Sequence, residues 1–124
     1  MTKAKRRVVV LGASKKPERY SNMAINRLIE AGYEVIPIHP ALELIGNLKV
    51  VPSLAKVEGE VDTLTVYVSP KLSSKMADAI ATVEPGRVIF NPGTENNELE
   101  AELNSRGIPT LHACSLVLLS TGQF

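Results

Sequence analysis

Aromatic residues, cysteine and net charge are all scarce in this chain of 124 residues. Aromatic residues make up 4% of the sequence and the formal net charge is +1, so it has few rings for base stacking and little excess positive charge. We therefore expect no nucleic-acid partner. The one cysteine, Cys114, excludes an internal disulfide framework and fits a reducing compartment.

Long hydrophobic runs are also missing. The apolar run 8–11 is shorter than the core of a signal peptide, which is about 7–15 residues, and no run approaches the ~20 residues of a membrane span. A cytoplasmic protein with no membrane partner is expected. Residues 1–124, with 44% hydrophobic and 22% charged residues, are enough for a single domain with a proper core.

The stretch from Val8 to Ser21 is the most informative part of the sequence. Residues 8–11 are all apolar, which is typical of a strand buried on both faces. Gly12 follows, where the backbone can take a positive φ and approach a ligand closely. Ser21 is suited to cap a helix whose apolar positions fall on one face. A strand, a tight turn and a helix N-terminus in this order favour an anion.

The turn itself is basic. Lys15, Lys16 and Arg19 stand against one acid, Glu18, which favours a phosphate-bearing ligand. The alternative, that these cations only solvate an exposed loop, stays open at this point. A second basic group, Lys3, Lys5, Arg6 and Arg7, lies at the opposite end of the first strand and is interpreted as a solubilising edge.

The rest of the chain alternates between strand and helix patterns. Expected strands cover 34–38, 63–68, 87–90 and 108–111, and expected helices cover 71–83 and 95–105. Residues 41–60 are irregular and predict a short edge strand and half a helix. The apolar run 116–119 is expected either to tuck onto the sheet, which we favour, or to bury itself against another copy.

Apolar strands alternating with helices predict an α/β fold: a doubly wound, three-layer domain with a mostly parallel sheet of five or six strands. The usual order places the second strand and the 63–68 strand on opposite sides of the first. A ligand then binds where the first and the 63–68 strands end. The residues at the strand ends are Gly12–Ser14, His39-Pro40, Ser69-Pro70, Asn91–Gly93 and His112–Cys114.

A nicotinamide or flavin dinucleotide is disfavoured. Its fingerprint needs three glycines and an acid about 20 residues further on, but only Gly12 is present, and His39-Pro40 stands where the acid belongs. Glu34 begins its strand and so faces the other edge of the sheet.

The two histidines and the cysteine form no catalytic group. His39 and His112 end strands that lie four positions apart in the expected sheet order. At ~4.8 Å per strand, about 20 Å separates the two residues, and no acid lies beside either in the sequence. We interpret both as loop histidines, and Cys114 as a small buried hydrophobic residue. No metal is expected.

Read together, these pieces resemble the small single-domain CoA-binding proteins, which are similar to the nucleotide-binding domain of the succinyl-CoA synthetase α chain. The resemblance covers nearly the whole chain in order. Its matching residues are Val9–Ser14, Pro17–Ser21, Gly32–Pro40, Ile45-Gly46, Val61-Asp62, Asn91–Gly93 and Cys114. The family usually has Asn-Pro where this chain has His39-Pro40, and a lysine often follows that proline, where Ala41 stands here. The family's Trp-x-Gln is Ile89-Phe90-Asn91 here.

The resemblance implies a Rossmann-like fold that holds CoA or an acyl-CoA along the strand ends. In that picture the turn from Gly12 to Ser21 takes the phosphates, Pro40 supports the nucleotide and Val68–Pro70 flanks the adenine. The implied site residues are Gly12, Ala13, Ser14, Lys15, Arg19, Tyr20, Ser21, His39, Pro40, Val68, Ser69, Pro70, Asn91 and Gly93.

Three functions follow, from different classes. The first is a CoA-binding module without chemistry of its own. The second is an enzyme that acts on an acyl-CoA or a nucleotide through His39 or Cys114. The third is an interaction domain that has lost its ligand, and the protein partner stays open in each case.

Overall fold

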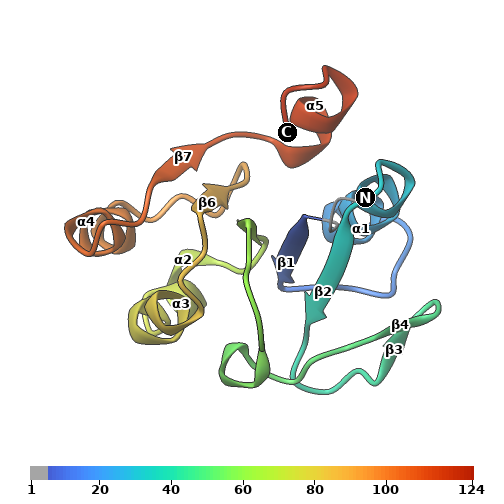
Figure 1. The fold of residues 1–124 in the computed structure, drawn as a ribbon, viewed down its shortest axis with the longest axis horizontal. Helices are drawn as coiled ribbons and strands as arrows, with labels where there is room; N and C mark the ends of the chain where they lie inside the picture. Colours follow the sequence, from blue (N-terminus) through green and yellow to red (C-terminus); the bar gives the residue numbers. More distant parts are fainter. Residues whose placement is uncertain (1–5) are drawn as a thin grey trace, which may run out of the picture.

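The computed structural model describes residues 6–124 and contains a five-stranded parallel sheet with helices on both faces (Figure 1). The strands of this sheet are β1 (Arg7–Leu11), β2 (Glu34–Ile38), β5 (Thr63–Val66), β6 (Arg87–Phe90) and β7 (Thr110–His112). Their spatial order is β2-β1-β5-β6-β7, so the predicted doubly wound order is confirmed, with β1 between β2 and β5. The fold is α/β and Rossmann-like.

The helices and the short elements fill the connections between these strands. They are α1 (Tyr20–Glu30), the hairpin β3 (Leu44–Ile45) and β4 (Leu48–Lys49), the 3₁₀ turn η1 (Leu54–Lys56), α2 (Pro70–Ser73), α3 (Ala77–Val83), α4 (Asn97–Ser105) and α5 (Ser115–Ser120). None of the helices in this part of the chain is long and apolar enough to cross a membrane.

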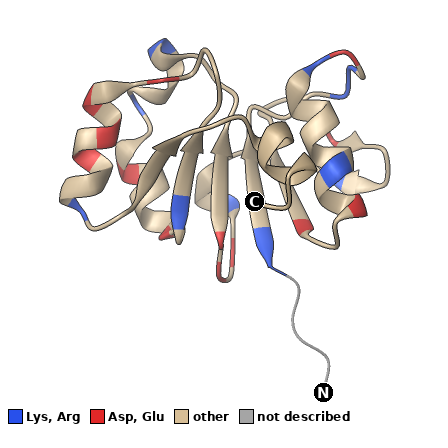
Figure 2. Cartoon of the chain, turned by 90° about the horizontal axis from the view of Figure 1, so that it is seen from above, with Lys and Arg blue, Asp and Glu red and all other residues tan. Residues whose placement is uncertain are grey.

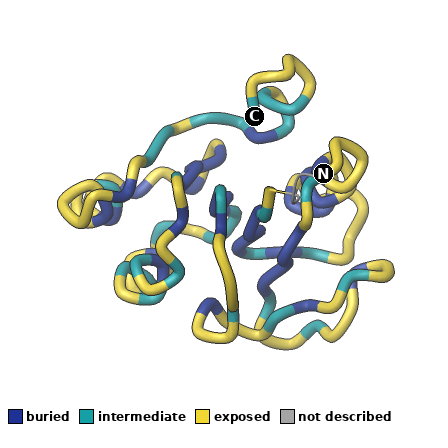
Figure 3. The backbone as a smooth tube through the Cα atoms, in the orientation of Figure 1, coloured by how far each residue is buried: buried dark blue, intermediate teal, exposed yellow. Residues whose placement is uncertain are grey.

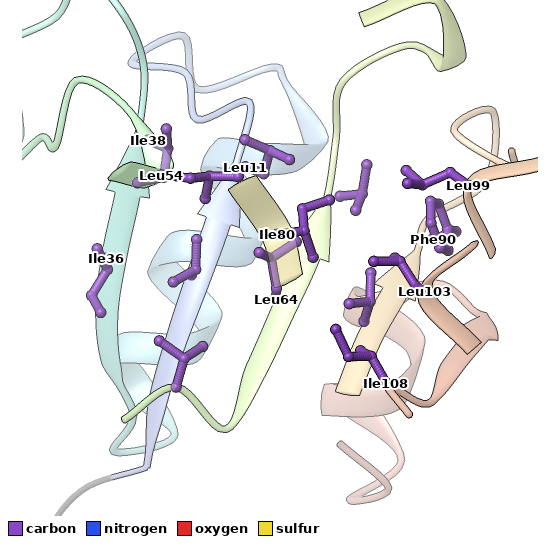
Figure 4. Packing of buried hydrophobic residues seen from close by; sticks show 14 residues of the cluster. Leu11, Ile36, Ile38, Leu54, Leu64, Ile80, Phe90, Leu99, Leu103 and Ile108 are labelled. Atoms are coloured by element: carbon purple, nitrogen blue, oxygen red, sulfur yellow. The ribbon is translucent and has the colours of Figure 1, made fainter. Parts of the chain in front are cut away.

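Each face of the sheet carries its own hydrophobic cluster, because successive side chains of a strand point to opposite faces. Val8 and Val10 pack with Ile25 and Leu28 of α1. Val9 and Leu11 pack on the other face, in a cluster whose helix side chains include Ile80, Leu99 and Leu103 (Figure 4). Strands β1, β2, β5 and β6 are the most deeply buried segments, whereas β7 and most of the loops are half-buried or exposed (Figure 3).

The predicted helix 71–83 is wrong, because the chain forms two helices there, α2 and α3. The Ser74 hydroxyl donates to the Pro70 carbonyl at 2.8 Å, and Asn96 Nδ2 donates to both the Ser73 and Ser74 hydroxyls at 3.0 Å. Met76, at φ −110°, precedes α3. Serine side chains that bond to nearby carbonyls compete with a continuous helix, and here a distant asparagine supports the break.

Several predicted boundaries also move. The strand predicted over 63–68 ends at Val66. Helix α1 begins at Tyr20 after Arg19, so Ser21 is not its cap and lies buried in the first turn. Helix α4 begins at Asn97, because Asn96 Oδ1 accepts from the Leu99 N–H at 3.1 Å. Strand β7 is Thr110–His112 rather than 108–111, since proline at 109 has no N–H to donate.

The irregular region and the chain end take specific forms. The short strands of region 41–60 pair with each other as β3 and β4, and Val51 forms one bridge to Ile38 of β2. The half helix is the η1 turn. The run 116–119 forms most of α5, which lies beside α1. Leu119 packs in the α1 cluster, as the favoured interpretation requires, while Val117 is 56% exposed.

The basic residues at the start of β1 form ion pairs at the end of the sheet opposite Gly12. Arg6 bonds to Asp62 at 2.9 Å and Arg7 to Glu34 at 2.6 Å, so they do more than solubilise an edge. Lys3 and Lys5 lie outside the described residues. Burial acts to raise the pKa of Asp62, but hydrogen bonds from Arg6 and Thr63 outweigh it and leave this pKa below its usual value.

We predict that Asp62 contributes to the acid sensitivity of the fold. Because its pKa is lowered in the folded state, its contribution is present above about pH 4, the unfolded pKa, and is lost as pH falls through the folded pKa. Asp62→Asn should therefore flatten the loss of stability below pH 4, measured by urea unfolding. The pair is partly exposed, so the effect is below about 1 kcal/mol and shrinks in high salt. An unchanged pH slope contradicts this.

Asn91 joins three elements inside the molecule. Its Nδ2 donates to Thr65 Oγ1 at 2.6 Å and to the Val66 carbonyl at 2.9 Å, and its Oδ1 accepts from the Ser115 N–H at 2.9 Å. The Thr65 and Ser115 hydroxyls bond to each other at 2.9 Å. This buried network attaches the start of α5 to the ends of β5 and β6.

Removal of the Asn91 amide should destabilise the fold. Asn91→Ala leaves a buried carbonyl and a buried N–H without partners, at about 1–3 kcal/mol for each group. We expect the free energy of unfolding to fall by about 2–4 kcal/mol in urea. Asn97→Ala is the matched control, because Asn97 is exposed, and it should change stability by less than about 0.5 kcal/mol. A similar effect of the two substitutions contradicts the prediction.

Candidate functional site

A cavity of about 1080 Å³ opens at the carboxyl ends of the strands, over the point between β1 and β5 where the sheet order reverses. The turn after β1, the start of α1, the ends of β2, β5 and β6, the η1 loop and the α2–α3 segment all contribute to it. Its lining residues are Leu11, Gly12, Ala13, Ser14, Lys16, Arg19, Tyr20, Ser21, Ile38, His39, Pro40, Pro52, Ser53, Leu54, Ala55, Tyr67, Val68, Ser69, Leu72, Met76, Ala79, Pro92, Gly93 and Thr94.

The turn after β1 is held by backbone and side-chain hydrogen bonds. The Ala13 N–H donates to the Ile38 carbonyl at 3.0 Å, which ties the turn to the end of β2. Ser14 Oγ accepts from the Lys16 N–H at 3.1 Å, and the Ser14 carbonyl accepts from Asn22 Nδ2 at 2.8 Å. The turn is therefore attached to a neighbouring strand and to the first turns of α1.

Gly12 is required at its position for two reasons. Its φ is +93°, a region that side-chain-bearing residues rarely adopt. A Cβ there would also lie 2.9 Å from Val68 Cγ1 and 3.0 Å from the Tyr67 carbonyl carbon. The glycine thus permits a close approach between the chain after β1 and the chain after β5, in addition to any approach of a ligand.

The N-terminus of α1 faces the cavity without a side-chain cap. Arg19 precedes the helix in an extended conformation, and in the described part of the chain no side chain accepts from the first turn, which also contains no acid. The backbone bonds of the helix begin with the Met23 N–H donating to the Arg19 carbonyl at 3.1 Å. Tyr20 and Ser21 line the cavity, so the helix dipole and free N–H groups favour an anion there.

The charge of the cavity is of one sign. Lys16 and Arg19 line it, and among residues 6–124 no aspartate or glutamate does. Figure 2 shows basic and acidic segments at the strand starts, and a loop at the upper right that carries blue segments with one red stretch. The cavity is therefore suited to a ligand with several negative charges.

A second part of the cavity lining is aliphatic. Leu54 of η1, Leu72 of α2, and Met76 and Ala79 of the α3 segment line it together with Val68. Leu72, in α2, is 54% exposed. Val68 was among the predicted site residues, whereas Leu72, Met76 and Ala79 were missed, since the prediction treated 71–83 as one helix with these side chains on its apolar face.

Tyr67 adds a neutral hydroxyl. Burial raises the pKa of Tyr67 to about 12, although the Ser115 and Thr65 hydroxyls act to lower it. The hydroxyl is thus protonated throughout the physiological range. Tyr67 therefore adds no negative charge to the cavity lining.

Most of the predicted site residues meet at this cavity. Those that line it are Gly12, Ala13, Ser14, Arg19, Tyr20, Ser21, His39, Pro40, Val68, Ser69 and Gly93. Three others do not. Lys15 lines a separate hollow of about 600 Å³ between α1 and the β3–β4 hairpin, Pro70 starts α2, and the Asn91 side chain is used within the buried network. Lys16, which was not among the predicted site residues, takes the place of Lys15.

The two histidines lie four strands apart in the order, as expected. His112 does have an acidic partner: its Nε2 bonds to Glu100 of α4, which is twelve residues away in the sequence. His112 and Cys114 do not line the cavity, and Cys114 is half-buried at the start of α5 rather than fully buried. Within residues 6–124, no group of three or more His, Cys, Asp or Glu could hold a metal ion.

Several known proteins are similar to this chain over most of its length. A crystal structure of an uncharacterized protein is 38% identical, with a TM-score of 0.90, and the match covers 98% of this chain and 100% of that one. The Thermus thermophilus protein solved as cell-free ID.343 is 30% identical, with a TM-score of 0.86, over 97% of this chain and 91% of that one. The uncharacterized protein YneT of Bacillus subtilis (strain 168) is 28% identical over 82% of this chain and 76% of its own.

The family assignment rests on a match over nearly the whole chain. The family model described as CoA binding domain matches residues 6–120, which include every strand of the main sheet and every residue that lines the cavity. This chain belongs to the CoA-binding domain family.

Proposed function

We propose that this protein binds coenzyme A in the cavity at the strand ends, with the phosphates at the turn after β1. The observation that carries the proposal is the make-up of the cavity: two cations, a free helix N-terminus, a group of aliphatic side chains, and no carboxylate among its described lining residues. CoA matches this make-up, because it carries three phosphate groups, an adenosine and a long arm that contains both amide and apolar groups.

The proposal places each part of the ligand. The pyrophosphate lies over Ser14 and the first turn of α1, where Arg19 adds a charge-assisted hydrogen bond. Pro40, at the end of β2, supports the nucleotide, and Val68, Ser69 and Pro70 flank the adenine. The opposite end of the sheet contributes nothing, because Arg6 and Arg7 are engaged there with acids.

The proposal includes no reaction of the bound ligand. His39 is the one histidine among the described lining residues, and no cysteine or carboxylate of that lining stands beside it to form a catalytic pair. CoA or acyl-CoA is held as a ligand, in the cytoplasm, by the domain of residues 1–124.

Coenzyme A should stabilise the protein against heat more than NAD does. A ligand at 100 times its Kd adds about 2.7 kcal/mol of stability, enough to raise the Tm by several degrees in a domain of this size. NAD shares the pyrophosphate but presents a free ribose to the end of β2, where no acid stands to bind its hydroxyls. Differential scanning fluorimetry with both ligands measures the effect. Equal shifts from both, or no shift with millimolar CoA, would contradict the proposal.

Arg19→Ala should weaken CoA binding while leaving the fold intact. Loss of one charge-assisted hydrogen bond lowers affinity roughly ten- to a hundredfold. Calorimetric titration with CoA and with dephospho-CoA, which lacks only the 3′-phosphate, locates the contact. Because Arg19 precedes the helix start where the pyrophosphate lies, we expect both ligands to weaken alike.

Arg27→Ala is the matched control, since Arg27 is exposed in the last turn of α1 and does not line the cavity. It should leave both affinities unchanged. Gly12→Val is a less direct test, because the new side chain would also displace Tyr67 and Val68. Unchanged affinities in Arg19→Ala would show that Arg19 is only a surface charge.

A further inference from the structure

His39 is held in one orientation by the loop that follows it. Its Nδ1 accepts hydrogen bonds from two successive backbone groups, the Ala41 N–H at 3.0 Å and the Leu42 N–H at 3.1 Å. The imidazole therefore closes the turn after β2 in the way that an asparagine or aspartate Oδ1 closes an Asx turn. His39 is also one of the residues that line the cavity.

These two bonds determine which ring nitrogen carries the proton. A nitrogen that accepts from two N–H groups has no hydrogen of its own, so the neutral ring carries its hydrogen on Nε2. Among residues 6–124, no acceptor forms a hydrogen bond with Nε2. One edge of the ring thus holds the turn, and the other edge offers a single N–H donor.

A donor at the end of β2 has a consequence for ligand choice. In dinucleotide-binding folds an acid at this place accepts hydrogen bonds from the free hydroxyls of a ribose. A donor, with no carboxylate among the described residues lining the cavity, instead suits an acceptor group such as a phosphate on that ribose. The donor and the cations belong to different elements, since Lys16 and Arg19 lie on the segment between β1 and α1.

We propose that His39 determines specificity by donating its Nε2–H to the phosphate on the ribose, so that the site selects ligands whose ribose is phosphorylated. This inference rests on the proposed function and assigns the 3′-phosphate of CoA to His39, apart from the pyrophosphate at Arg19.

Two variants separate the roles of the two edges of the His39 ring. His39→Asp keeps an oxygen that can accept from the Ala41 N–H and removes the outer donor, whereas His39→Asn keeps both an acceptor oxygen and an amide N–H donor.

The experiment is calorimetric titration of wild type and both variants with CoA and dephospho-CoA. Wild type should bind CoA at least tenfold more tightly than dephospho-CoA. His39→Asp should weaken CoA about a hundredfold and leave dephospho-CoA nearly unchanged, because it removes the donor and its carboxylate repels the 3′-phosphate. His39→Asn, which keeps a donor, should still bind CoA more tightly than dephospho-CoA. Competition by adenosine 3′,5′-bisphosphate and by AMP should give the same pattern without the pantetheine arm.

Two controls keep the result specific. The Tm of both variants should match wild type, because the turn keeps its acceptor. His112→Asn removes the other histidine, which does not line the cavity, and should change neither affinity.

The outcomes also separate the two proposals. Equal binding of CoA and dephospho-CoA by wild type, or equal weakening of both in His39→Asp, overturns the role of His39 and leaves CoA binding standing. Binding of neither ligand by wild type overturns the proposed function and this inference with it.

Discussion

The close approach of the chain after β1 to the chain after β5 is the constraint on which the site depends. Gly12 makes it possible, since its φ of +93° and its missing Cβ let the backbone pass Tyr67 and Val68. The turn that follows is fixed to β2 through the Ala13 N–H and to α1 through Asn22. One glycine therefore sets how the N-terminus of α1 and the ends of β2 and β5 meet around the cavity.

A sequence reading predicts the parts of the fold that depend on local pattern. Apolar runs such as Val8–Leu11 indicate buried parallel strands, and the strand order follows from the usual crossover rules. The break between α2 and α3 is not predictable in this way. It depends on Asn96, more than twenty residues further on, whose amide bonds to Ser73 and Ser74.

The same division applies to the candidate site. The turn after β1 and the ends of β2 and β5 were predicted from glycine, proline and charge in the sequence, and they line one cavity. Which of two adjacent lysines lines that cavity depends on the path of the turn. Both were predicted to favour a phosphate, but the implied site residues included Lys15, whereas Lys16 lines the cavity. The Asn91 side chain, expected near the ligand, instead forms hydrogen bonds with Thr65, Val66 and Ser115. No pattern in the sequence indicates that network.

The two ends of the sheet differ in how their cations are satisfied, and this difference supports a binding function. Arg6 and Arg7, at the strand starts, bond to Asp62 and Glu34. Within residues 6–124, the salt bridges found do not include Lys16 or Arg19, which stand beside an uncapped helix N-terminus. Like charges placed together without counter-charges destabilise a fold. A polyanionic ligand would remove that repulsion, so binding at this end would stabilise the protein and would also neutralise the negative charges of the ligand.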